Sequence, residues 1–195
     1  MTQVLYNNQV VPYVAQKGIL NDFYRNGSTL TNSISISATS DKGGMNVSVS
    51  NMKSDGVTPN NTYTRKTINL GFGYDLSEKF SIKGNINYSN EENENPPVVS
   101  EQDNSIPTAL LAMANTMPLS VLEANQFNSV GGEYSYSRFT NRTNPYWVLS
   151  KVRQNVIRDR VFGNLSIKYD VTKWLFAQVR VGQDYWSRNQ DYTNS

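Results

Sequence analysis

The sequence contains no cysteine and no histidine among its 195 residues. Thiol nucleophiles, imidazole bases and metal sites built on these two side chains are therefore excluded. Paired carboxylates remain possible, but Glu91, Glu92 and Glu94 stand beside prolines in an expected loop. We therefore expect neither enzymatic activity nor a bound cofactor. The lack of cysteine also fits a protein that uses no disulfides and exposes no thiol to an oxidising compartment.

Charge is scarce as well. Charged residues make up 17% of the chain, below the usual share of about a quarter in soluble proteins, and the formal net charge is +2. A net charge this small gives no reason to expect nucleic acid as a partner. Asn, Ser and Thr fill the deficit, which is typical of a wet lumen and of long surface loops. The sequence also has no run of about 18 apolar residues, which excludes a transmembrane helix.

What the chain does have is alternation, seen most clearly between Val161 and Tyr185. Successive side chains of a strand point to opposite faces. Here one face collects apolar side chains, while the other collects polar ones that include Lys168 and Arg180. An unpaired charge in a dry core is prohibitively costly, so the second face must be wet. This pattern, with aromatic residues at the strand ends, is typical of a wall between lipid and water.

Repeats of the same unit predict an all-β fold, an antiparallel up-and-down meander. Six strands are expected near 29–39, 45–52, 65–75, 80–90, 155–169 and 174–186. The connections between them alternate between short turns at 40–44, 75–79 and 170–173 and long loops at 53–64 and 91–152. Alternate connections of a meander lie at opposite ends. All short turns should therefore face one way and all long loops the other, as in outer-membrane barrels.

The chain divides into two parts on this interpretation. Residues 1–28 are a loop that enters the first strand, and residues 29–195 are a partial transmembrane β-barrel with about six strands. The long loop at 91–152 would be extracellular. It should carry one short helix near 108–116, which Pro118 stops.

Four aromatic residues of this loop are candidates for contact with a ligand or a partner: Tyr134, Tyr136, Tyr146 and Trp147. Aromatic faces with polar tips can stack on sugar rings. The alternative is that these side chains pack loop against loop or contact a partner protein. The sequence leaves these alternatives open.

The alternation also assigns side chains to the two faces of the sheet. The predicted convex, lipid-facing set is Ile68, Leu70, Phe72, Ile82, Ile86, Leu165, Ile167 and Val179. The predicted concave set is Asn69, Lys83, Asn85, Asn164, Lys168 and Arg180. Three of its members, Lys83, Lys168 and Arg180, are interpreted as lumen-lining cations that are hydrated or paired with carboxylates.

A calcium site is a weaker hypothesis. Glu91, Glu92, Glu94 and Asp103 supply the oxygen ligands that calcium prefers. Their spacing matches no calcium motif, so a merely solvated run of charge is the favoured interpretation.

Several segments, in order along nearly the whole chain, resemble the SusC/RagA-type TonB-linked outer-membrane transporters. The segments that carry the resemblance are 22–27, 31–37, 50–52, 56–60, 65–70, 144–147 and 158–164. Each motif is weak alone, and their common order makes the resemblance specific. The sequence departs from a complete member because it shows no plug, no TonB-contacting segment and too few strands to close a barrel.

The resemblance implies a fragment of a barrel in the bacterial outer membrane. The intact protein would import oligosaccharides or peptides with a SusD-like surface lipoprotein and energy from the TonB complex. The loop at 91–152 would lie where the lipoprotein and the ligand meet. The alternative is a secreted or cell-surface β-sheet binding protein or adhesin, whose apolar face would pack on a second sheet instead of on outer-membrane lipid.

Overall fold

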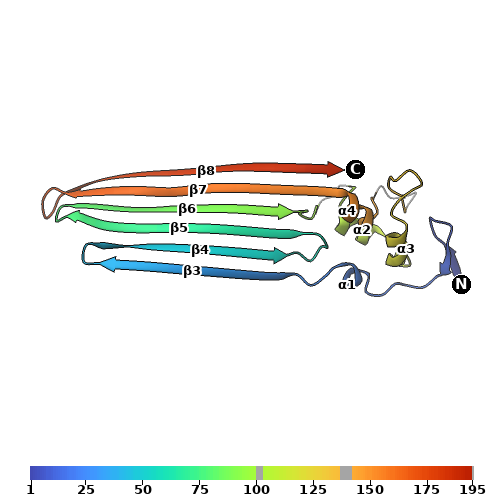
Figure 1. Ribbon diagram of the computed structural model, residues 1–195. Coiled ribbons are helices and arrows are strands. Elements are labelled where there is room, and N and C mark those ends of the chain that lie inside the picture. The colour runs from blue at the N-terminus through green and yellow to red at the C-terminus, as the bar shows by residue number, and fades with distance from the viewer. Residues whose placement is uncertain (100–102, 137–141, 195) are drawn as a thin grey trace.

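The computed structural model describes residues 1–99, 103–136 and 142–194. One antiparallel sheet dominates it, with its strands in the order β3-β4-β5-β6-β7-β8. Every strand pairs with its neighbours in sequence, so the sheet is an up-and-down meander (Figure 1). The predicted all-β fold class and the six strands are confirmed.

The strands are longer than the sequence indicated. Their bounds are Ser28–Ser40 (β3), Gly43–Asp55 (β4), Thr62–Ser77 (β5), Phe80–Glu94 (β6), Val152–Asp170 (β7) and Phe176–Asn194 (β8). The prediction ended each strand near the last apolar residue. The backbone ladder continues beyond that point through mostly polar segments, where no regular alternation of apolar and polar side chains marks a strand.

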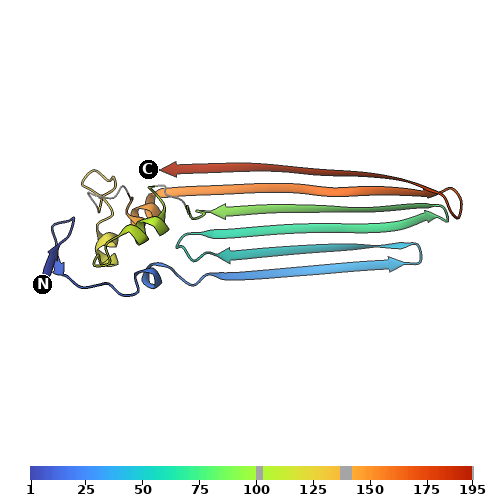
Figure 2. The ribbon, with the colours of Figure 1, turned by 180° about the vertical axis from the view of Figure 1, so that it is seen from behind.

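The three short turns all lie at one end of the sheet, as predicted (Figures 1 and 2). The connection between β4 and β5 is shorter than expected, because β4 extends to Asp55 and β5 begins at Thr62. Gly43 has a φ of 145°, a backbone conformation that favours glycine. The close approach of its backbone to Gly73 and Tyr74 of β5 also leaves no room for a Cβ atom at this position.

Strand register confirms the predicted division of side chains between the two faces. Directly paired residues of an antiparallel sheet share a face. We call one of the two faces the apolar face. One of its rows joins Ile36, Val47, Leu70 and Ile86, and the adjacent row includes Leu165 and Val181. The opposite, polar face includes Ser37, Asn46, Gly71, Asn85, Asn164 and Gly182. A register shift occurs between Asp75 and Ser77, beyond the predicted sets, and Ile167 and Lys168 lie on opposite faces. That the apolar face is the convex one stays a prediction.

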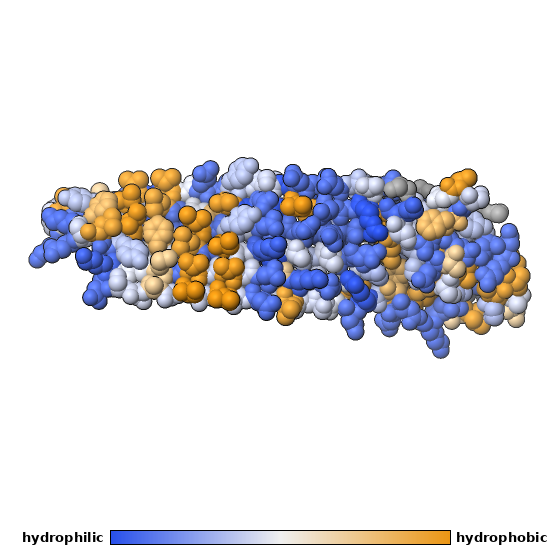
Figure 3. Space-filling view, in the orientation of Figure 1, coloured by the Kyte–Doolittle hydropathy of each residue, from blue (hydrophilic) through white to orange (hydrophobic). Residues whose placement is uncertain are grey.

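Apolar side chains on the apolar face form a band over the turn end of the strands, which Figure 3 shows as bands of orange. Its last row toward the loops joins Ile34, Val49, Ile68, Tyr88, Val161 and Tyr185. The next row is wholly polar: Asn32, Asn51, Lys66, Asn90, Asp159 and Ser187. Toward the turns the band reaches Phe80, Tyr169 and Ala177. We call it the apolar band.

The other end of the molecule is a cluster of short elements, which we call the loop cluster. It contains β1 (Thr2–Val4), β2 (Val10–Pro12), α1 (Ile19–Phe23), α2 (Ile106–Ala112), α3 (Leu119–Ala124) and α4 (Pro145–Lys151). Residues 1–28 are therefore not simply a loop, since they form a small hairpin and one helix before β3 begins. The expected helix near 108–116 is α2, displaced toward the N-terminus, and α3 and α4 were not predicted as helices.

All of the buried apolar residues of the described chain lie in this loop cluster. One core joins Leu5, Met117, Val121, Leu122 and Tyr136, and a second joins Phe23, Ile106, Leu110 and Val148. Each core combines residues of the N-terminal segment with residues of the long connection between β6 and β7. The N-terminal segment and the long connection therefore fold as one unit.

The described residues form no second sheet against the apolar face, because their only other sheet is the β1–β2 hairpin at the far end (Figure 2). The second sheet that the alternative interpretation requires is therefore not supplied by the described residues. No helix within the described ranges is long and apolar enough to cross a membrane.

Candidate functional site on the polar face and in the loop cluster

The polar face carries three predicted cations near the turns. Ser166 pairs with Lys83 on one side and with Arg180 on the other, so these two cations share a row. Both are exposed, and neither has an ion-pair partner within the described ranges. Lys168 differs, since its Nζ lies 2.7 Å from Oδ1 of Asp170 and 5.0 Å from the centre of the Phe176 ring. Its partner therefore lies within this chain.

A larger group of charges, which the sequence analysis missed, lies on the same face nearer the loop cluster. One row joins Arg65, Glu91, Arg158 and Arg188 across β5 to β8. Arg160 and Trp186 pair in the adjacent row, and Asp184 follows in the next. We call these seven residues the arginine patch. Arg158 and Arg160 are two residues apart, as are Trp186 and Arg188, so the sequence alone places each pair on one face of its strand. Only the register shows that the two pairs lie beside each other.

The carboxylates of the patch are already engaged. Glu91 lies between two arginines, with Oε1 3.5 Å from Nε of Arg65 and Oε2 3.7 Å from Nη1 of Arg158. Asp184 accepts two hydrogen bonds from Arg160, one of them from Nε at 2.9 Å. Four guanidinium groups thus face two carboxylates, which leaves an excess of positive charge.

The four candidate aromatic residues lie in the loop cluster. Tyr136 is buried, and its hydroxyl donates to the backbone carbonyl of Ala109. Tyr134 stands edge to face against Tyr6, with ring centres 5.1 Å apart. Burial, together with the neighbouring Tyr134, raises the pKa of Tyr6 to about 12.

The other two aromatic residues begin α4. Tyr146 packs edge to face on Phe23 with ring centres 5.3 Å apart, and burial raises its pKa. Trp147 packs against the core that contains Phe23, and its Nε1 is buried without a hydrogen-bond partner within the described ranges. These contacts favour loop-to-loop packing for the four aromatic residues. Ligand contact by the half-buried Tyr134, Tyr146 and Trp147 stays a prediction.

Asn144 explains why the segment 144–147 forms a helix start. Its side-chain oxygen accepts from the backbone N–H of Tyr146 at 3.0 Å, and Pro145 follows at the position where a helix tolerates proline best. Its Nδ2 donates to the backbone carbonyl of Leu122 at 3.0 Å. The wholly buried amide therefore joins α3 to α4.

The structure does not assemble the calcium ligands. Glu91, Glu92 and Glu94 belong to β6 instead of a loop, and the pleat places Glu91 on the face opposite Glu92. Glu92 accepts a hydrogen bond from Asn155, and Glu94 accepts one from Thr62. No group of three or more metal-ligating side chains occurs within residues 1–99, 103–136 and 142–194.

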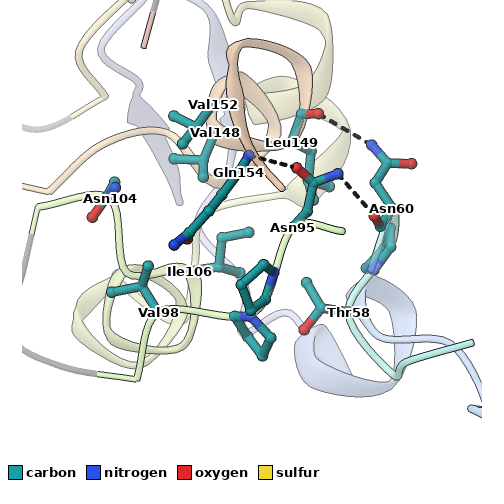
Figure 4. Close-up of a pocket in the computed structure, with 13 residues that line it drawn as sticks. Thr58, Asn60, Asn95, Val98, Asn104, Ile106, Val148, Leu149, Val152 and Gln154 are labelled. Atoms are coloured by element: carbon teal, nitrogen blue, oxygen red, sulfur yellow. Dashed lines mark hydrogen bonds between the residues drawn. The ribbon is translucent and has the colours of Figure 1, made fainter. Parts of the chain in front are cut away.

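A small cavity marks the junction between the loop cluster and the sheet (Figure 4). Its volume is about 50 Å³, which is room for water and not for a sugar or a peptide. Asn95 closes one side, since its Nδ2 donates to the carbonyl of Asn60 at 2.9 Å and its Oδ1 accepts from the N–H of Gln154 at 3.1 Å. Asn60 in turn donates to the carbonyl of Leu149. This network fixes α4 against the sheet.

Together, these features define a class of structure: an open antiparallel wall with one exposed apolar face, one polar face and structured loops at one end. The chain matches no protein-family model. No curated protein matches it. Among solved structures it is similar to a chain in the "Structure of the RagAB peptide importer in the 'closed-closed' state", with a TM-score of 0.69 and 15% identity. The match covers 91% of this chain and 20% of that chain, so the present chain spans about a fifth of its length.

Proposed function

We propose that the sheet is part of the wall of a bacterial outer-membrane β-barrel, with its apolar face toward lipid. The apolar band carries this proposal. On β7 it runs from Val161 to Tyr169, about nine residues, and a tilted transmembrane strand needs about 9–11 residues to cross the bilayer. Outer-membrane barrels have an outward apolar band about 25 Å tall between aromatic girdles. Tyr88 and Tyr185 stand at one border, and Phe80 and Tyr169 at the other.

Exposure supports the same assignment. Ile68, Ile86 and Leu165 are 48%, 49% and 41% exposed, although each belongs to a strand that is paired on both sides. A contiguous apolar face of this kind needs a covering phase or partner. Because β3 and β8 each pair on one side only within the described ranges, further strands would continue the wall at both edges and protect them from aggregation.

The polar face would then line the lumen. Lys83, Lys168 and Arg180 are hydrated there or paired with carboxylates, as Lys168 is with Asp170. The intact protein would be a TonB-dependent importer of oligosaccharides or peptides, served by a SusD-like surface lipoprotein at the loop cluster. Two observations support this proposal: the fold similarity to a peptide importer and the gathering of all structured loops at one end.

Cysteine labelling can test the orientation of the wall, because this chain supplies no native cysteine and any cysteine elsewhere in the full-length protein can be replaced by serine beforehand. In the full-length protein in outer membranes, Val179→Cys should react with a lipid-soluble maleimide and resist a charged one. Arg180→Cys, its neighbour on the polar face, should react with the charged reagent once detergent opens the lumen. Asp159→Cys is the matched control, since it shares the face of Val179 but lies beyond the apolar band. It should react with the charged reagent on intact cells.

Two labelling results would contradict the proposal. One is equal reaction of the Val179 and Arg180 positions with the charged reagent. The other is protection of the Asp159 position, which would place the band boundary elsewhere.

The proposed import role has its own test. Replacing residues 104–147 by a short Gly-Ser linker in the full-length protein should leave the barrel inserted, because this backbone lies beyond the apolar band. Growth on peptides or oligosaccharides as sole nutrient should fall, since ligand capture or lipoprotein docking is lost. Normal insertion with growth at the parental rate would remove this role from the loop cluster.

A further inference from the structure

We propose that the arginine patch is a binding site for a carboxylate group of the imported solute. The inference rests on the proposed function, which makes the polar face the lumen, and it narrows the ligand to acidic peptides or acidic oligosaccharides. Four observations carry it: a like-charge pair, an excess of guanidinium groups, a hollow, and an exposed indole.

Arg158 and Arg188 are direct cross-strand partners on one face. Like charges in this position destabilise a sheet, so the pair opposes folding unless an anion lies against it. Within the described ranges no carboxylate makes an ion pair with Arg188. Its Nη2 donates to the neutral Oε1 of Gln190 at 2.7 Å. Arg158 has only the long contact to Glu91, which Arg65 shares.

The neighbouring residues show which anion the patch accommodates. Asp184 and Arg160 already form a two-bond guanidinium–carboxylate pair on this surface. The planar guanidinium matches a carboxylate in this way, with charge-assisted hydrogen bonds. Arg158 and Arg188 can offer the same groups to a carboxylate that arrives from the lumen.

The site also has room and a hydrophobic wall. Arg158, Arg160, Asp184, Trp186 and Arg188 line a hollow of about 350 Å³ on the polar face. The Trp186 side chain is 60% exposed there. An indole of this kind offers a flat surface on which a side chain or a sugar ring next to the carboxylate can stack. The four arginines of the patch lie on the loop side of the apolar band, where a solute entering from outside would arrive first.

The test compares acidic and neutral probes on the full-length protein in detergent, by calorimetry at low salt. The peptide probe is the hexapeptide Gly-Asp-Tyr-Ser-Glu-Gly, and its neutral counterpart carries Asn, Gln and a C-terminal amide. The sugar probe is galacturonic acid trimer, and its neutral counterpart is the galactose trimer. We expect one acidic probe to bind at least tenfold more tightly than its counterpart. The probe that does so identifies the source of the carboxylate.

Removal of the like-charge pair should abolish this preference. The double variant Arg158→Gln with Arg188→Gln should bind the preferred acidic probe about tenfold to a hundredfold more weakly, a loss of about 1.4 kcal/mol for each factor of ten. Lys66→Gln is the matched control, because it removes one positive charge from the opposite face of the same region. It should leave the affinity unchanged within twofold.

Thermal stability without ligand separates this proposal from a structural role. If the pair awaits a solute, the double variant should melt at the same temperature as the parent or higher, because a repulsion is removed. A lower melting temperature would show that a carboxylate elsewhere in the protein fills the site, and would overturn the proposal. So would equal binding of acidic and neutral probes, binding of neither acidic probe, or parental affinity in the double variant. None of these results affects the cysteine test of the wall.

Discussion

The loop cluster buries its apolar residues within the chain, whereas the sheet leaves its apolar residues exposed. Leu122 is wholly buried in the loop cluster, among side chains of the same chain. Val179 and Val181 of the sheet pair with Ile167 and Leu165 of β7, yet both are mostly exposed. The loop cluster follows the rule of a water-soluble domain, in which the chain supplies its own core. The sheet has no such core and depends on its surroundings for the same free energy.

Buried polar residues also differ between the two regions. In the sheet, the residues that become buried include Ser89 and Ser166, which are small and lie on the polar face. In the loop cluster, the buried polar residue Asn144 is held by named hydrogen bonds. The comparison teaches that hydrophobicity in this chain marks a core at one end and an interface at the other. The predictions that follow probe this contrast.

The largest effect should come from a charge in the apolar band. Leu70→Arg places a guanidinium inside the apolar band, one row from its loop-side border, and such a charge costs up to about 2–4 kcal/mol, the value at the bilayer midplane. We expect the full-length protein to insert poorly. Asn69→Arg, one residue away on the polar face, should insert normally. Heat-modifiable migration of outer-membrane fractions measures both. Equal insertion of the two variants would remove the lipid assignment of the apolar face.

A cavity created in the loop cluster should destabilise that region and leave the sheet unaffected. Leu122→Ala removes a wholly buried side chain, which typically costs about 2–5 kcal/mol. We expect faster hydrogen exchange in α2, α3 and α4 and unchanged protection in the sheet. Leu111→Ala is the control, because that side chain is 75% exposed. Loss of protection throughout the sheet would show that the two regions do not fold independently.

Asn144→Ala tests the polar counterpart of this core. It leaves the N–H of Tyr146 and the carbonyl of Leu122 without their partner, at about 1–3 kcal/mol for a buried unsatisfied group. The start of α4 should exchange hydrogen faster, and limited proteolysis should cut within 142–151 earlier. A variant with the parental cleavage pattern would show that water replaces the amide.

The smallest effect concerns alkaline pH. Burial raises the pKa of Tyr6 to about 12 in the folded protein, above the ordinary tyrosine value of 10.0. The folded state therefore holds this proton more tightly, so the stabilisation is complete below about pH 10 and is lost as pH rises toward 12. Hydrogen exchange in the loop cluster should accelerate over this range, while the sheet should not respond.

Tyr6→Phe should weaken that response without removing it. The remaining pH dependence has the same sign, since burial also raises the pKa of Tyr24 and of Tyr146. A variant with the parental pH profile would show that Tyr6 does not carry the effect.

The face assignments were accessible from sequence because a strand has a period of two. Ile167 and Lys168 must point to opposite faces in any regular strand, and the register confirms that they do. The loop cluster was not accessible in this way. Its elements are short, α3 and α4 have only a turn or two each, and its cores join Leu5 and Phe23 to residues about a hundred positions later. No local pattern encodes such contacts.

The sequence by itself determined the meander, its turns, the two faces and the positions of Lys83, Lys168 and Arg180, because all of these follow from local alternation. Tertiary structure decided which strands continue past the apolar band, how α4 is fixed to the sheet, and that Arg158 stands opposite Arg188. Those features depend on register and on packing between distant segments. A one-residue slip would have sent every arginine of one strand to the other face.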